Sequence, residues 1–153
     1  MGKSNGGINM NQNDVQDKIQ LIDSLVRESS IKNIDKIHNG KELNITSQIG
    51  FKIVNIEEKE KNFVGQISLI NDLLLKIQEK EVSTIHVRMD GLFTGSKEME
   101  RREFEEMLKI KGATILSHFM RAYIHTITGL SGMPNINTPM IDFKKFFEKT
   151  EKE

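Results

Sequence analysis

Apolar and polar residues alternate along much of the first two thirds of the chain. The apolar side chains occupy odd-numbered positions, and a period of two is typical of a strand with one buried face. Wholly polar stretches at 57–62 and 78–81 separate the alternating segments. Short polar turns between such segments predict antiparallel strands in a meander or a Greek key. The alternating segments are residues 43–53, 63–77, with an irregularity expected near Asn71 and Asp72, and 85–93.

Residues 15–34 do not fit one period. Apolar residues recur there at spacings of three or four, which suggests a helix, but residues 24–34 are rich in Ser, Val and Ile, which suggests a strand. The pattern leaves both alternatives open. Residues 1–14 are rich in Gly and Asn, so we expect a disordered segment there, followed by a single domain over residues 15–153.

The period changes after residue 96. Charges of both signs alternate around an apolar stripe in residues 97–111, which predicts an amphipathic helix with a solvated face. Ser96 is a candidate N-cap because its hydroxyl can accept a hydrogen bond from a free amide in the first turn.

Residues 112–130 are apolar over most of a helical circumference, with one narrow polar stripe. A helix packed on a single sheet needs an apolar arc of only about 100° or somewhat more. The extra apolar surface must therefore be covered by more of this chain or by another copy. Gly132 and Pro134 end the helix, residues 135–141 form an extended loop, and Asp142 can cap a short last helix.

The composition narrows the function classes. Lysine plus arginine equals aspartate plus glutamate, at 22 each, so the net charge argues against a general nucleic-acid binder or a polybasic membrane module. The absence of cysteine excludes disulfides and thiolate chemistry and fits a cytoplasmic protein. No apolar run approaches the roughly 20 residues that span a bilayer, so we expect no membrane insertion.

Candidate catalytic chemistry is sparse. His118 and His125 lie on the same helix face, but Arg121 stands between them and would repel a cation. The acidic residues of 97–111 interleave with basic ones, as on an ordinary solvated face. There is no phosphate-binding loop or nucleophile elbow, so we expect no catalytic residue, no metal and no cofactor.

The C-terminal third carries a family resemblance. Residues 112–124 read Gly-Ala, then a Leu, then an aromatic residue before Arg121, with an Ile three beyond it. A Gly/Pro helix exit, an Asn-rich loop with Pro139 and an Asp-Phe pair follow. Together with Gly91-Leu92-Phe93, this ordered set over residues 88–148 resembles the SecB protein-export chaperone family.

That resemblance implies an α+β fold with a four-stranded antiparallel, Greek-key-like sheet and a long and a short C-terminal helix. It also implies a homotetramer, built as a dimer of dimers with the long helices packed between subunits. The interface residues would be Ile115, Phe119, Tyr123 and Ile127.

The resemblance further implies apolar grooves that hold unfolded polypeptides without ATP. Spacing alone favours a core role for most of the candidate groove residues, whereas the resemblance favours the groove. These candidates are Phe51, Phe63, Met133, Pro134, Ile136, Met140, Phe143, Phe146 and Phe147.

The chain departs from the family pattern at several points. His118 stands where the family usually has Pro, and Thr138 where it favours Leu. Glu28 matches an exposed acid that helps to dock the SecA motor, but Lys32 stands at another such position, so docking to SecA is expected to be weak. Two functions follow as expectations: an export holdase, or a SecB-like chaperone of a toxin–antitoxin or phage system that protects a dedicated partner.

Overall fold

The structure is a computed structural model that describes residues 18–38 and 40–151. The disordered segment expected over residues 1–14 lies outside the described residues, as do the first residues of the ambiguous segment. No described helix is both long and apolar enough to cross a bilayer.

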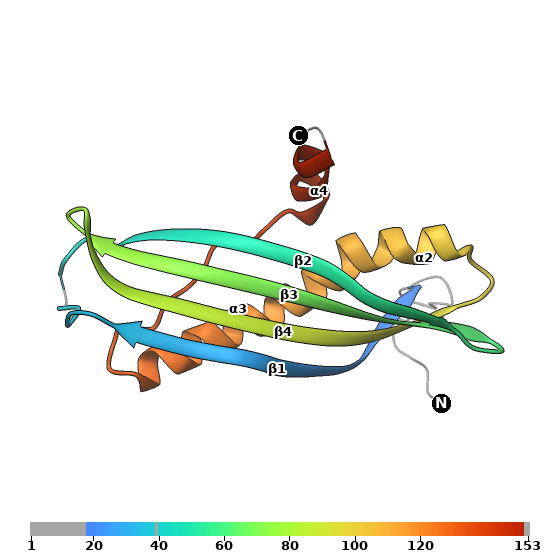
Figure 1. The fold of residues 1–153 in the computed structure, drawn as a ribbon, viewed down its shortest axis with the longest axis horizontal. Coiled ribbons are helices and arrows are strands. Elements are labelled where there is room, and N and C mark those ends of the chain that lie inside the picture. The colour runs from blue at the N-terminus through green and yellow to red at the C-terminus, as the bar shows by residue number, and fades with distance from the viewer. Residues whose placement is uncertain (1–17, 39, 152–153) are drawn as a thin grey trace, which may run out of the picture.

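Four long strands form one antiparallel sheet (Figure 1). Its spatial order is β1-β4-β3-β2. Hairpins join β2 to β3 and β3 to β4, and β1, the first strand in the chain, pairs with the free side of β4. This is a Greek-key arrangement, as predicted. The first segment is a strand and not a helix. The strands are β1 (Ile19–Asn33), β2 (Asn44–Glu58), β3 (Asn62–Ile77) and β4 (Lys80–Ser96).

The strand register places the odd-numbered residues of β3 and β4 on one face of the sheet. Leu69 of β3 lies between Phe51 of β2 and Met89 of β4, and all three point to this face, which we call the helix face. The opposite face is the outer face. The β3–β4 register is continuous through residues 71 and 72, so the predicted irregularity there is wrong; the shift comes later, between Leu75 and Lys76.

Two bulges in β1 explain why its sequence pattern was ambiguous. The register with β4 shifts between Leu21 and Asp23 and again between Val26 and Glu28. A bulge sets two residues opposite one and so changes the phase of the alternation. Apolar residues at spacings of three and four therefore occur in a strand, although that spacing is typical of a helix.

The helical region forms a single rod: α2 (Arg101–Met107), the π-helical turn η1 (Leu108–Gly112) and α3 (Ala113–Leu130). The helix begins later than predicted, because Glu100 and not Ser96 is the N-cap. Ser96 ends β4, and its hydroxyl accepts a hydrogen bond from the Glu98 amide at 3.1 Å in the turn.

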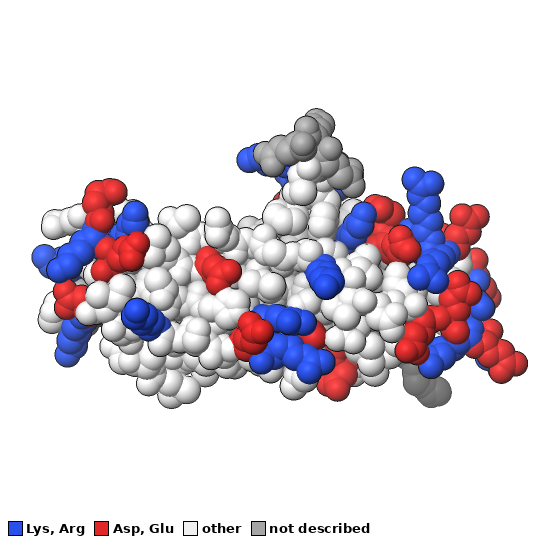
Figure 2. All heavy atoms as spheres, in the orientation of Figure 1, with Lys and Arg blue, Asp and Glu red and all other residues white. Residues whose placement is uncertain are grey.

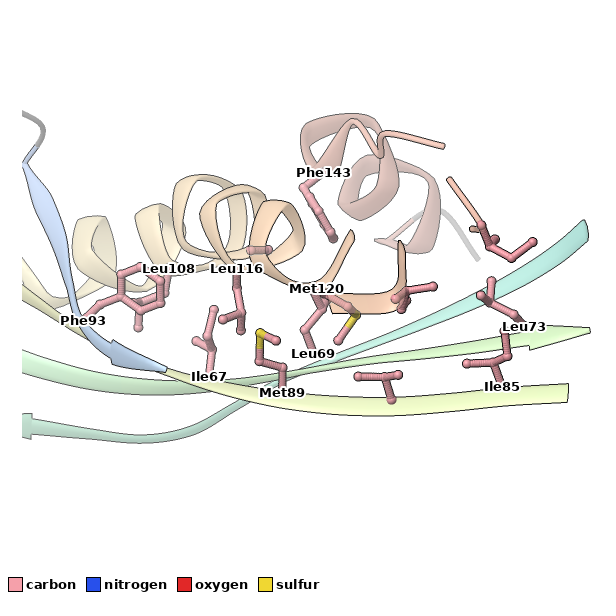
Figure 3. Close-up of a cluster of buried hydrophobic side chains, with 14 of the residues drawn as sticks. Ile67, Leu69, Leu73, Ile85, Met89, Phe93, Leu108, Leu116, Met120 and Phe143 are labelled. Atoms are coloured by element: carbon pink, nitrogen blue, oxygen red, sulfur yellow. The ribbon is translucent and has the colours of Figure 1, made fainter. Parts of the chain in front are cut away.

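The hydrophobic core lies between this rod and the helix face (Figure 3). In Figure 3, the side chains of Ile67, Met89 and Phe93 point from the strands toward Leu108 and Leu116 of the rod. Glycines in the sheet let the rod approach closely, and Gly65 lies beneath Leu108 and Phe104.

The chain leaves α3 through Gly132, which has a φ of +89° as expected for a residue just beyond a helix end. Residues 131–142 then form an extended loop that leads to α4 (Phe143–Glu151). The backbone amide of Lys145 donates to the Asp142 carboxylate at 3.2 Å, so Asp142 caps α4 as predicted. Figure 1 shows α4 above β2 in that view, and α4 also contacts η1 of the rod.

Candidate polypeptide-binding site

A hollow of about 500 Å³ opens where β1 passes into the crossover segment and α3 passes into the loop. Residues 33–37 line one side of it and residues 131–133 the other. Ile37 and Met133 are buried, whereas the Ile34 side chain is 51% exposed. The hollow thus has a mixed lining, in which polar and charged residues stand beside one exposed aliphatic residue, Ile34.

The side of the hollow nearest the sheet is fixed by hydrogen bonds. The Ser83 hydroxyl, which is buried on β4, lies 2.9 Å from the Asn33 side-chain oxygen and 3.2 Å from the Lys32 carbonyl. The same hydroxyl lies 4.0 Å from the Met133 sulfur. These contacts link the end of β1 and the start of the loop through Ser83 of β4.

The loop after α3 is tied to that helix by polar contacts. The hydroxyl of Thr128 accepts a hydrogen bond from the Ile136 amide at 2.9 Å, and the Asn135 amide group donates to the His125 carbonyl at 2.8 Å. Arg121 donates to the Thr138 carbonyl at 2.8 Å. These hydrogen bonds attach the loop to α3, and the Ile136 side chain of the loop is buried.

Three phenylalanines of α4 form an aromatic cluster with β2. Phe143 is 1% exposed, and its ring centroid lies 5.8 Å from that of Phe146. Phe147 meets Phe51 edge to face at a centroid distance of 5.1 Å. The cluster attaches α4 to the sheet and leaves Phe146 and Phe147 half-buried at the surface.

The structure brings most of the predicted groove residues into this region but buries several of them. Four are in the core: Phe63, Met133, Ile136 and Phe143. Phe63 lies apart from the hollow, stacked on Phe104 at 5.2 Å. The residues that keep accessible surface are Phe51, Pro134, Phe146 and Phe147, which are half-buried, and Met140, which is 66% exposed.

The sequence reasoning missed the crossover residues Ile34 and Ile37. Both are isolated aliphatic residues in a polar stretch, and that isolation was a usable signal. Nothing in the period of the sequence shows that this stretch meets the end of α3, which lies almost 100 residues later.

The predicted interface residues of α3 form one row along the helix. Phe119 is 48% exposed, while Ile115, Tyr123 and Ile127 are half-buried against the core. The Tyr123 hydroxyl donates to the Ser29 hydroxyl of β1 at 2.8 Å. Leu130 at the end of α3 is 82% exposed, so the rod carries apolar surface that the described chain does not cover.

Several charged side chains on the outer face are paired with one another. Figure 2 shows a mixed cluster of both signs near the middle of the molecule, over β1 and β4, besides the charges at both ends. Arg27 donates to the Asp90 carboxylate at 2.8 Å, and Gln66 donates to it at 3.0 Å. Burial raises the pKa of Asp90, but hydrogen bonds with Arg27, Ser68 and Gln66 and the charge of Arg88 outweigh burial and hold that pKa below its ordinary value.

Within the described residues, no three histidine, aspartate or glutamate side chains are grouped as metal ligands. His125 instead lies 2.8 Å from the side-chain oxygen of Asn137 in the loop. His125 therefore contacts Asn137 of the loop and not a second histidine.

Comparison with known proteins agrees with this fold. Residues 12–153 match the family model of SecB, the preprotein translocase subunit SecB. A SecB-like chaperone from Mycobacterium tuberculosis, solved with a peptide from an antitoxin, shares 18% identity at a TM-score of 0.61, over 81% of this chain and 91% of that one.

A protein of unknown function from Streptococcus agalactiae shares 13% identity over 79% of this chain and 96% of its own, and its TM-score of 0.39 is too low to indicate a common fold. No curated protein matches the sequence. The family model nevertheless spans almost the entire chain, from residue 12 to residue 153. The chain therefore belongs to the SecB family.

Proposed function

We propose that the protein is an ATP-independent holdase chaperone that binds unfolded polypeptides and performs no covalent chemistry. The carrying observation is the hollow lined in part by Ile34, together with exposed Met140 on the loop that leads to the aromatic cluster of α4. Unfolded chains differ from folded ones by their exposed apolar side chains. Burial of such side chains stabilises a complex by roughly 25 cal/mol per Å² without requiring a particular sequence.

Flexible side chains suit this task. Methionine adapts its shape to different partners, and Met140 is available at the surface while Met133 lines the hollow. Long clients can make many weak contacts at once, so affinity should rise with client length and short peptides should bind poorly.

The test is the suppression of aggregation of a chemically denatured client, followed by light scattering without nucleotide. Ile34→Asp and Met140→Asp change exposed side chains, so the fold should survive, and the suppression should fall severalfold. Val54→Asp is the matched control, because Val54 is 40% exposed on β2 outside the hollow and the loop. Full activity of the first two variants, with folded protein confirmed by circular dichroism, would place the client site elsewhere.

The assembly proposed for this function is a cytoplasmic homotetramer. The uncovered apolar row on α3 supports association with other copies, since a closed symmetric oligomer buries such a surface. Light scattering of the wild-type protein at micromolar concentration should give the mass of a tetramer, and a monomer would contradict this assembly.

Two client classes compete. The first is precursor proteins for Sec-dependent export, delivered to the SecA motor. The second is one dedicated partner in a toxin–antitoxin or phage system, which the antitoxin peptide bound to the mycobacterial SecB-like chaperone makes a specific alternative.

The outer face bears on this choice. Glu28, the candidate docking acid, is in contact with His86 and Arg88, and Asp90 is held by Arg27. Paired acids leave little free negative charge for docking, so binding to SecA should be weak and strongly salt-sensitive. Tight binding to SecA that persists at high salt would favour the export function, and its absence would favour the dedicated partner.

A further inference from the structure

His86 lies on the outer face of β4 with a carboxylate on each side. Its Nδ1 is 2.5 Å from the Asp72 carboxylate of β3, and its Nε2 is 2.7 Å from the Glu28 carboxylate of β1. The register agrees, because His86 lies opposite Asp72 on β3 and opposite Ser30, two residues from Glu28, on β1. One imidazole ring thus spans three adjacent strands.

This geometry requires a particular protonation state. A neutral imidazole has one N–H donor and one acceptor nitrogen, whereas the imidazolium donates from both nitrogens. With ionised carboxylates on both sides, only the imidazolium can donate to Glu28 and Asp72 at the same time. Loss of the proton would set a nitrogen lone pair against a carboxylate oxygen.

We propose that His86 is a proton-dependent clamp, which as an imidazolium ties β1 to β3 across β4 and on losing its proton loosens the middle of β1. The inference does not depend on the chaperone function. The clamp matters most for β1, because β1 is an edge strand that pairs only with β4, whereas β3 and β4 are each flanked by strands on both sides.

The other charged groups near the ring do not bridge the two carboxylates. Arg88, two residues along β4, lies 3.9 Å from the Glu28 carboxylate, and Lys32 lies opposite Thr84 on the same face. Gln48, which pairs with Asp72 from β2, is uncharged. Deprotonation therefore removes the one cation that contacts both Glu28 and Asp72 in the described residues.

The pKa of His86 agrees with this geometry. Hydrogen bonds to Asp72 and then Glu28 raise it above its ordinary value, against a smaller opposing effect of burial. Because the raised pKa belongs to the folded state, the clamp contributes fully at pH values below the pKa of an unfolded histidine. Its contribution is lost as the pH rises through the folded pKa.

The clamp lies between a bulge in β1 and the segment of β1 that leads to the hollow. The bulge between Val26 and Glu28 interrupts the β1–β4 register beside the clamp. Beyond the clamp, β1 continues through residue 33 into Ile34, which lines the hollow. The clamp therefore holds the strand between an irregular segment and one wall of the candidate site.

The first experiment is an NMR titration of the histidine rings in the wild-type protein, with the His86 signal assigned by its absence in His86→Gln. We expect its pKa to lie above that of the unfolded protein and to fall in Asp72→Asn and in Glu28→Gln. A wild-type pKa at or below the unfolded value would overturn the proposal without reference to any variant's stability.

The second experiment follows amide-exchange protection in residues 28–32 as the pH rises through the His86 pKa. We expect the protection factors in the wild type to fall by roughly three- to tenfold relative to β3. His86→Gln should show the lower protection at every pH. His118→Gln is the control, since His118 is exposed on α3 across the sheet, and it should behave as wild type. Equal, pH-independent protection in the wild type and His86→Gln would overturn the clamp.

Discussion

The two ends of the helical rod meet the same sheet in different ways. At the α2–η1 end, Phe104 and Leu108 are fully buried, and glycines in the sheet make room for them. In α3, which we call the open end of the rod, Leu116, Met120 and Ile124 are buried, but Phe119 is 48% and Leu130 is 82% exposed. Both ends are rich in large apolar residues, so hydrophobicity alone does not decide which end anchors the fold and which offers a surface to other molecules. Beneath Phe104, the glycines Gly65 and Gly95 leave the space that its ring occupies.

The largest effect should come from removing a buried side chain at the α2–η1 end of the rod, which we call the packed end. Phe104→Ala removes a ring that stacks on Phe63 and has no exposed surface. The loss of buried area and the cavity left behind should lower the free energy of unfolding by about 3–5 kcal/mol. Urea denaturation followed by circular dichroism measures this change.

Phe119→Ala is the matched control for that variant, because it removes the same ring from the open end. In protein diluted below the concentration at which copies associate, it should cost less than about 1 kcal/mol. Equal losses in the two variants would show that the exposed end is packed as tightly as the buried one.

A somewhat smaller effect should follow from filling a glycine gap. A Cβ on Gly65 would lie 2.6 Å from the Leu108 Cδ1 and 2.9 Å from the Phe104 ring. Gly65→Ala therefore forces the rod to shift, and we expect a loss of about 1–3 kcal/mol in unfolding free energy.

Gly50→Ala is the control for the same sheet. A Cβ there would lie 3.6 Å from Ile70, which is an ordinary contact. A thermal melt of Gly50→Ala should match wild type within a few degrees. If Gly65→Ala melted at the same temperature as Gly50→Ala, the close approach of the rod to the sheet would not limit the size of residue 65.

Much of the sheet could be predicted because three of its strands keep nearly strict alternation between polar turns. β2, β3 and β4 lie where that alternation placed them. The bulges of β1 could not be predicted, since a bulge depends on pairing with β4 and not on the local sequence. The π-helical turn at Leu108–Gly112 was equally hidden, because it joins two stretches that differ in pattern.

The candidate site was predicted less completely than the fold. Phe143 and Phe119 are both apolar helix residues, yet one is 1% and the other 48% exposed. Which side of a helix meets the sheet depends on contacts between residues far apart in the chain. For the same reason Phe63, predicted as a groove residue, lies under Phe104 in the core.

A charge on the open end should change assembly while the fold of each subunit survives. Phe119→Asp places a carboxylate in the apolar row proposed as an interface, and a charge buried without a partner is costly. We expect the mass measured by light scattering to fall from that of a tetramer to that of a smaller species, with the circular dichroism spectrum retained. Val54→Asp, a similar change at an exposed residue of β2, should keep the wild-type mass.

The smallest effect should be confined to α4, the short helix that follows the loop. The Asp142 carboxylate accepts a hydrogen bond from the Lys145 amide, and Asp142→Ala would leave that amide without this partner. Loss of an N-cap costs about 1 kcal/mol, and here the cost should fall on the attachment of α4 and not on the sheet. Amide exchange in residues 145–149 should therefore speed up roughly fivefold while protection in β3 stays constant. Asp142→Asn retains a capping oxygen without the charge, so it should stay close to wild type. If Asn were as harmful as Ala, the carboxylate charge and not the cap would hold α4 in place; if protection in β3 also fell, α4 would belong to the same cooperative unit as the packed end.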